Sequence, residues 1–225
     1  HYLGISDHSK IVVYANGLSV ERLKKQAEEI QALNETFDDF RIFHGTECDI
    51  MLDGSLDFSD DVLASLDFVV ISVHQKLSMS QEEATNRIVR AMQNPYATIL
   101  GHPTGRVLLE REGYPLDYDK IFSVAVEHHV VIEINASPYR FDLDWRFIRQ
   151  AKDSGVKLSI NPDAHSIDGL KDTFWGVGIA RKGWLAATDV LNTMDRNELV
   201  NFLRGNGKES NVRKAGIANR HLLRK

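Results

Sequence analysis

Side chains that can bind metal ions recur along this sequence, each close behind a short apolar run. They are His8, Glu47, His74, His102, Asp163 and His165. One histidine in such a place is more often a structural hydrogen-bond donor than a ligand. Several imidazoles and carboxylates gathered together, however, need a compensating charge, because unpaired buried charge is costly. Bound cations would supply that charge, so the recurrence indicates a metal centre.

The mixture of donor atoms narrows the choice of metal. Imidazole nitrogen combined with carboxylate oxygen suits zinc, manganese or iron better than calcium or magnesium. A site of this kind usually gives one ion about four ligands, so six candidates predict more than one ion. We therefore expect divalent metal ions, with manganese or zinc favoured.

Short strands that alternate with helices must position these side chains. Apolar, β-branched runs separated by stretches of helical period are typical of βα units and a parallel sheet. The predicted strands are Tyr2–Ser6, Phe40–Thr46, Phe68–Val73, Ala97–Gly101, Val130–Ile134 and Lys157–Ile160. The predicted helices are Ser19–Leu33, Ser80–Met92, Tyr118–His128, Leu143–Asp153 and Arg196–Leu203. Carboxyl ends of parallel strands meet at one rim, so the candidate ligands are expected to converge there.

Helix start signals support these boundaries. Ser80 precedes Glu82 and Glu83, and Asp142 opens the stretch that Gly155 closes. Such residues are preferred at helix starts and ends, with acidic side chains in the first turn.

Composition excludes several classes of protein. The 225 residues are 43% hydrophobic and 26% charged, as in globular proteins, and no apolar run is long enough to span a membrane. The single cysteine, Cys48, cannot form an internal disulfide, which predicts a cytoplasmic protein. A net charge of -5 argues against nucleic-acid binding by bulk electrostatics, although ligand carboxylates would hide a locally positive site.

The regular pattern leaves room for one α/β domain. We predict a domain over residues 1–203 and a basic tail over residues 204–225, in which Glu209 is the one acidic residue. The tail is either a solvated terminus or a contact for nucleic acid or a neighbouring domain.

Basic and polar side chains follow the same strands and predict an anionic substrate. The candidates are Lys10, Lys76, Arg106, Asn135 and Arg140. Lysine and arginine beside a metal centre suit phosphate oxygens, although each of these charges could equally be an ordinary surface charge. The phrase from Gly101 to Arg106 lacks the spacing of a P-loop, which disfavours a nucleotide-hydrolysing motor.

Seven phrases in this order resemble the PHP (polymerase and histidinol phosphatase) domain, and specifically the one in the C-terminal part of bacterial and archaeal family X DNA polymerases. The phrases are Ile5-Ser6-Asp7-His8-Ser9-Lys10, Gly45-Thr46-Glu47-Cys48-Asp49-Ile50, Ser72-Val73-His74, Gly101-His102-Pro103-Thr104-Gly105-Arg106, Glu133-Ile134-Asn135-Ala136, Asp163-Ala164-His165 and Ala180-Arg181-Lys182-Gly183-Trp184. The resemblance covers nearly the whole sequence.

The resemblance implies a distorted (βα)7 TIM-like barrel with up to three metal ions. It carries the six candidate ligands over as metal ligands, with Glu47 bridging two ions, and makes Glu47, His74 and Asp163 catalytic. The family opens with a strand bearing a His-x-His motif and a further ligand soon after. This sequence does not contain them. We therefore expect a barrel that lacks its first strand.

The implied activity is metal-dependent hydrolysis of DNA. It is 3′–5′ exonuclease activity, with 3′-phosphatase or abasic-site cleavage as further possibilities, in a repair polymerase whose polymerase domain is the partner. Manganese is the expected activator. Two alternatives stay open: a small-molecule phosphatase similar to histidinol phosphatase, and a non-catalytic module that braces the polymerase. The resemblance also leaves open whether a chain lacking the first strand is active.

Overall fold

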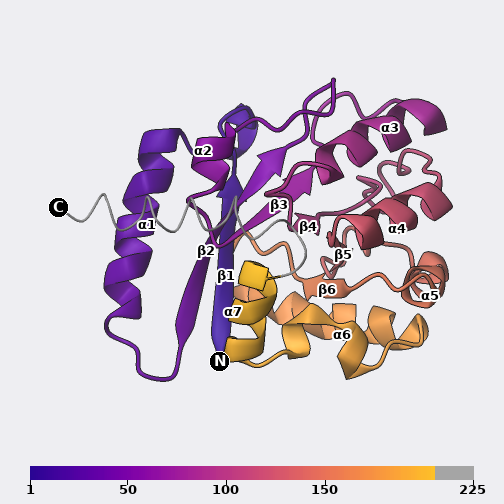
Figure 1. The fold of residues 1–225 in the computed structure, drawn as a ribbon. Helices are drawn as coiled ribbons and strands as arrows, with labels where there is room; N and C mark the ends of the chain where they lie inside the picture. Colours follow the sequence, from indigo (N-terminus) through magenta and orange to yellow (C-terminus); the bar gives the residue numbers. More distant parts are fainter. Residues whose placement is uncertain (206–225) are drawn as a thin grey trace.

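Six parallel strands form one curled sheet whose spatial order is the order of the sequence. The computed structural model describes residues 1–205. The strands are β1 (Tyr2–His8), β2 (Arg41–Asp49), β3 (Phe68–Ser72), β4 (Ile99–Leu100), β5 (Val131–Asn135) and β6 (Leu158–Asn161). The sheet is a half-barrel surrounded by helices, consistent with a TIM-like barrel (Figure 1). The six predicted strands are confirmed, whereas a (βα)7 count stays a prediction.

Seven α-helices lie within the described residues. They are α1 (Val20–Asn34), α2 (Asp60–Leu63), α3 (Gln81–Met92), α4 (Tyr118–Glu127), α5 (Trp145–Asp153), α6 (Thr173–Lys182) and α7 (Arg196–Gly205). The 3-10 turns are η1 (Val13–Ala15), η2 (Asp168–Asp172), η3 (Ala187–Asp189) and η4 (Leu191–Thr193). None of the described helices combines the length and the apolar character needed to cross a membrane. Apart from its first two residues, the predicted basic tail lies outside the described residues.

Two helix predictions need correction. Helix α5 begins at Trp145 rather than Leu143, because Asp144 and not Asp142 accepts the hydrogen bond from a first-turn backbone N–H. Helix α6 was not predicted, because its two glycines weaken the helical signal. A Cβ on Gly176 would lie 2.5 Å from Ile160 and 2.6 Å from Ala136. The glycine therefore lets α6 lie directly against the sheet.

The inner face of the sheet changes from apolar to polar along the strands. Alternate residues of a strand share a face, so Phe43, Glu47 and Asp49 of β2 point inward while Cys48 points to the outer core. The apolar inner cluster is Phe43, Val70, Ile99, Val131, Leu191, Leu199 and Leu203, with Tyr2 and Phe68 packed against it. Helix α7 closes this end, beside the N-terminus (Figure 1). The polar side chains are left at the carboxyl ends.

Glycines make room for this inner cluster. A Cβ on Gly45 would lie 2.6 Å from the ring of Phe68, whereas a Cβ on Gly178 in α6 would have no heavy atom within 4 Å. The same substitution is therefore expected to have opposite effects at the two positions.

We predict that Gly45→Ala lowers the free energy of unfolding by about 1–3 kcal/mol through overpacking. Gly178→Ala raises it by about 0.5–1 kcal/mol, because alanine is the better helix residue. Urea unfolding followed by circular dichroism measures both changes. Equal effects of the two substitutions would contradict the close packing of Phe68 on β2.

Candidate metal centre

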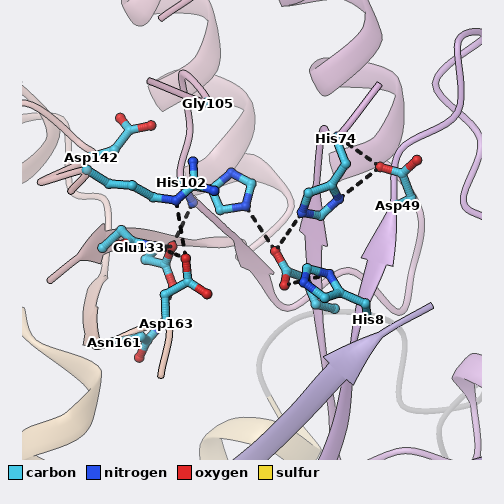
Figure 2. A network of polar contacts seen from close by, with 12 residues as sticks. His8, Asp49, His74, His102, Gly105, Glu133, Asp142, Asn161 and Asp163 are labelled. Atoms are coloured by element: carbon cyan, nitrogen blue, oxygen red, sulfur yellow. Dashed lines mark hydrogen bonds and ion pairs between the residues drawn. The ribbon is translucent and has the colours of Figure 1, made fainter. Parts of the chain in front are cut away.

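Glu47, near the end of β2, lies at the centre of three histidines. Its Oε1 is 3.0 Å from Nε2 of His102 and 3.2 Å from Nε2 of His74. Its Oε2 is 3.2 Å from Nδ1 of His8. Figure 2 shows the three imidazoles around this one carboxylate. The structure thus brings together four of the six side chains predicted as ligands.

The register of the sheet explains this convergence. The pairing of β1 with β2 sets His8 directly beside Glu47, and both side chains lie on the inner face. Strand β3 ends at Ser72, so His74 stands two residues further along on the same alternation. His102 follows β4 differently, because Leu100 packs in the outer core and strand alternation alone would not carry His102 inward; its backbone leaves the strand conformation with a φ of 23°. Strands β1, β3 and β4 therefore deliver their imidazoles to the carboxylate carried by β2.

A second carboxylate fixes the ring of His74. Asp49 Oδ1 lies 3.1 Å from Nδ1 of His74 and accepts the backbone N–H of the same residue at 3.0 Å. Asp49 Oδ2 accepts from the side-chain amide of Gln75 at 3.2 Å. A carboxylate on one imidazole nitrogen sets the ring orientation and the tautomer. Nε2 of His74 is thereby turned toward Glu47.

Glu133 fixes the backbone at His102. The backbone N–H of His102 donates to Glu133 Oε2 at 2.6 Å. The φ angle of His102 is 23° and that of Asp163 is 52°, both in the left-handed region that non-glycine residues rarely adopt. Such backbone costs of order 1–3 kcal/mol and persists where the surroundings enforce it. Two of the predicted ligands are therefore held in strained backbone.

The charges of the cluster shift its pKa values in opposite directions. Burial alone would raise the pKa of Glu47, but the hydrogen bond with His102 and the facing imidazole of His74 hold it well below its usual range. Burial alone would lower the pKa of His74, yet Asp49 and Glu47 raise it to about 9. For His8 burial outweighs the carboxylates, and its pKa is lowered. Without a metal ion, the cluster thus holds an ionised Glu47 against a protonated His74.

Asp163 and His165 complete the set of predicted ligands beside His8. Asp163 Oδ2 accepts from Asn135 Nδ2 at 3.1 Å and pairs with Arg140 Nε at 3.3 Å. His165 Nδ1 lies 2.9 Å from the backbone carbonyl of Asp163, so Nδ1 donates and Nε2 is left to accept. The ring of His165 is 5.9 Å from that of His8. All six predicted side chains thus lie at one rim.

Two of the predicted substrate contacts, Arg106 and Asn135, form hydrogen bonds within the protein. Arg106 donates from Nε to the Arg140 carbonyl at 2.8 Å, from Nη1 to Asp144 at 2.5 Å and from Nη2 to the Phe141 carbonyl. Asn135 is fully buried and donates to Glu133 and Asp163. The polar groups of Arg106 and Asn135 are thus hydrogen-bonded within the protein. These bonds hold the surrounding loops and the Asp163 carboxylate in place.

The other three predicted substrate contacts lie nearer to solvent. Lys10 and Lys76 are exposed, and Lys76 has a φ of 50°. The Arg140 side chain is 21% exposed and pairs with Asp163. These three cations lie on loops that follow β1, β3 and β5 at the rim. Their contact with an anionic substrate stays a prediction.

Three polar residues of the site, two buried and one half-buried, were not assigned a role from the sequence. They are Asp49, which orients His74; Glu133, which fixes His102; and Asn161, whose Nδ2 donates to Glu133 Oε1 at 2.9 Å. Burial and its neighbour Asp163 raise the pKa of Glu133 to about 7, although His102 opposes the rise. Strand alternation is the signal that could have found them, since Asp49 is two residues beyond Glu47 on the same face.

The donor atoms of the cluster fit a metal ion. One ligand atom from each of His8, Glu47 and His74 lies within 4.8 Å of the other two. Nδ1 of His8 and Nε2 of His74 are buried without a hydrogen-bond partner among the described residues. Buried polar atoms are normally satisfied, so two such nitrogens beside one carboxylate are a chemical reason for a cation. Imidazole with carboxylate is also the donor set expected for zinc or manganese.

Relatives of the chain carry names that bear on this chemistry. It is 43% identical over 205 residues to the DNA polymerase/3′-5′ exonuclease PolX of Bacillus subtilis, covering 91% of this chain and 36% of the relative. It is 32% identical over 146 residues to a probable phosphatase of Thermoanaerobacter, covering 60% and 57%. A probable phosphatase of Clostridium acetobutylicum is 28% identical over 188 residues, covering 77% and 72%.

The chain therefore spans only part of the length of these relatives. No protein-family model matches it. The relatives nevertheless support the resemblance to a PHP-type domain of a family X polymerase.

The contacts of Asp144 generate a pH prediction. Hydrogen bonds from Arg146 and then Arg106 hold the pKa of Asp144 well below its ordinary value. A carboxyl group whose pKa is lower in the folded than in the unfolded state stabilises the fold when the pH is above its unfolded pKa of about 3.9. This stabilisation is lost as the pH falls through the pKa of the folded state. We expect Asp144→Asn, which keeps the helix cap, to lower the melting temperature above about pH 5 and to approach wild type near pH 2.

Asp153→Asn is the matched control, because Asp153 forms only an exposed pair with Arg149 in the same helix. Calorimetric melting temperatures between pH 2 and pH 7 measure both variants. A deficit of Asp144→Asn that is the same at every pH would contradict the assigned role of its charge.

Proposed function

We propose that this chain is the PHP-type phosphoesterase module of a family X DNA polymerase and that it removes nucleotides from the 3′ end of DNA. The observation that carries the proposal is the buried Glu47 carboxylate with the facing nitrogens of His8 and His74. The similarity to a polymerase with a named 3′-5′ exonuclease activity supports the choice of DNA as substrate. The polymerase portion is then the partner, and a cytoplasmic location follows.

In this proposal His8, Glu47 and His74 hold the first metal ion, and His102, Asp163 and His165 extend the centre to further ions. Glu47 is suited to bridge, because its two oxygens face different imidazoles. Bound manganese or zinc would lower the pKa of a water ligand and neutralise charge on a phosphate oxygen.

The chain's own side chains do the remaining work. Asp49 keeps Nε2 of His74 aimed at the centre, and Arg140 with Asn135 keeps the Asp163 carboxylate at the rim. Glu47, His74 and Asp163 are therefore the proposed catalytic residues. Lys10 and Lys76 attract the anionic substrate from the exposed side, and cations beside a phosphodiester stabilise its growing negative charge.

A small-molecule phosphatase is the second candidate. It is favoured by the probable phosphatases, one of which this chain covers to 72% of its length. The two candidates share the same metal centre and differ in the substrate that fits above it. A non-catalytic module is less favoured, because the six predicted ligands are present and lie together at the rim.

We predict that the chain with manganese releases nucleotides from 3′-end-labelled single-stranded DNA, that EDTA abolishes the release, and that His74→Ala reduces it at least about 100-fold. His128→Ala, which alters a histidine at the end of α4 outside the centre, should behave as wild type. Gel analysis of the labelled products measures the rate. Hydrolysis of p-nitrophenyl phosphate or histidinol phosphate without DNA digestion would favour the small-molecule phosphatase. If the protein hydrolyses neither these phosphomonoesters nor DNA, the non-catalytic module is favoured.

We also predict that Asp49→Asn weakens manganese binding about 10- to 100-fold, because a neutral amide no longer fixes the ring of His74 as a carboxylate does. Calorimetric titration of the metal-free protein measures the affinity. The matched control is Asp53→Asn, since Asp53 is an exposed aspartate of the following turn. An unchanged manganese affinity in Asp49→Asn would show that Asp49 does not support metal binding.

A further inference from the structure

Exposed apolar side chains gather on three loops beside the candidate metal centre. They are Val13 and Tyr14 on the loop after β1, Leu108 and Leu109 on the loop after β4, and Tyr139 on the loop after β5. We call these five residues the apolar rim. Large exposed apolar groups that occur together are a mark of a binding surface. They lie on the carboxyl side of the sheet, where the polar cluster also lies.

Hydrogen bonds join two of these loops into one surface. The backbone N–H of Leu108 donates to the carbonyl of Tyr139 at 2.7 Å. Arg140 Nη1 donates to the carbonyl of Arg106 at 3.3 Å. Leu109, at the tip between the bridged residues Val107 and Arg111, has a φ of 65° and is fully exposed. At the tip, the backbone of Leu109 is therefore strained and its apolar side chain is exposed to solvent.

Tyr14 connects the third loop to the metal centre. Its side chain is 79% exposed, so the ring is available to a ligand. Partial burial of the hydroxyl and the carboxylates of Asp49 and Glu47 raise its pKa, while Arg140 and Arg111 oppose the rise. Tyr14 lies in η1, on the loop that directly follows β1, and β1 ends at His8. The loop that carries Tyr14 therefore begins next to one of the residues that face Glu47.

We propose that the apolar rim binds the unpaired bases of a single-stranded DNA end, with Tyr14 stacking on the base next to the phosphodiester held at the metal centre. Aromatic rings with flanking cations are how single strands are held without sequence preference, since every base has a π-face. Arg140 and Arg111 supply positive charge on the same side for the backbone. A small phosphomonoester would leave the rim uncovered. This inference rests on the proposed function and names the form of DNA that the site takes.

The test compares Tyr14→Ala and Tyr14→Phe on two labelled oligonucleotides of equal length, one intact and one with abasic 3′-terminal nucleotides. We expect Tyr14→Ala to raise KM about tenfold on intact DNA, with little change in kcat and no change in KM on the abasic strand. Tyr14→Phe keeps the ring and should restore the wild-type KM. Phe37→Ala, an exposed aromatic before β2 at the opposite end of the sheet, is the control.

Fluorescence anisotropy of the same oligonucleotides, measured without metal, separates binding from hydrolysis. If no DNA is hydrolysed by any protein, the proposed function fails, and the rim is then supported only if Tyr14→Ala still weakens binding of the intact strand. If wild type hydrolyses DNA while Tyr14→Ala matches it on both strands, the rim proposal is wrong. An equal loss on intact and abasic strands would also overturn it, because the effect would not depend on a base.

Discussion

A buried carboxylate between three imidazoles is the constraint on which the carboxyl end of this sheet depends. Glu47 can stay ionised at such depth only because His8, His74 and His102 face its two oxygens. Among the described residues, Nδ1 of His8 and Nε2 of His74 have no hydrogen-bond partner, and buried polar atoms are costly when they are not satisfied. The cluster therefore combines a negative carboxylate with facing imidazole nitrogens, as expected of a cation site.

The surroundings are built by the strand alternation and by a second layer of carboxylates. The inner face is filled by apolar side chains where the strands begin and by the predicted ligands where they end, so the apolar cluster and the polar site lie at opposite ends of one face. Asp49 and Glu133 then fix His74 and His102 from behind. Because each of these contacts crosses between neighbouring strands, the centre depends on the register of the whole half-barrel.

Much of this arrangement could be predicted from the sequence, because its signals are local. The apolar runs and helix caps indicated the strands and most helices, and the first or second residue after each predicted strand identified His8, Glu47, His74 and His102. What the sequence did not show depends on partners distant along the chain. Arg106 was predicted to bind a substrate phosphate. In the structure its guanidinium donates hydrogen bonds to backbone carbonyls of the loop after β5.

Asn135 and α6 show the same limitation. Asn135 donates hydrogen bonds to Glu133 and Asp163, and these contacts depend on the folded arrangement of β5 and the loop after β6. The helix carrying Gly176 gave a weak helical signal because its glycine serves close packing on the sheet.

The most direct test of the central claim is anomalous X-ray scattering from crystals soaked in manganese, with Glu47→Gln crystals for comparison. The account predicts a peak between Glu47, His8 and His74 that Glu47→Gln loses; manganese found only at exposed carboxylates elsewhere would contradict it.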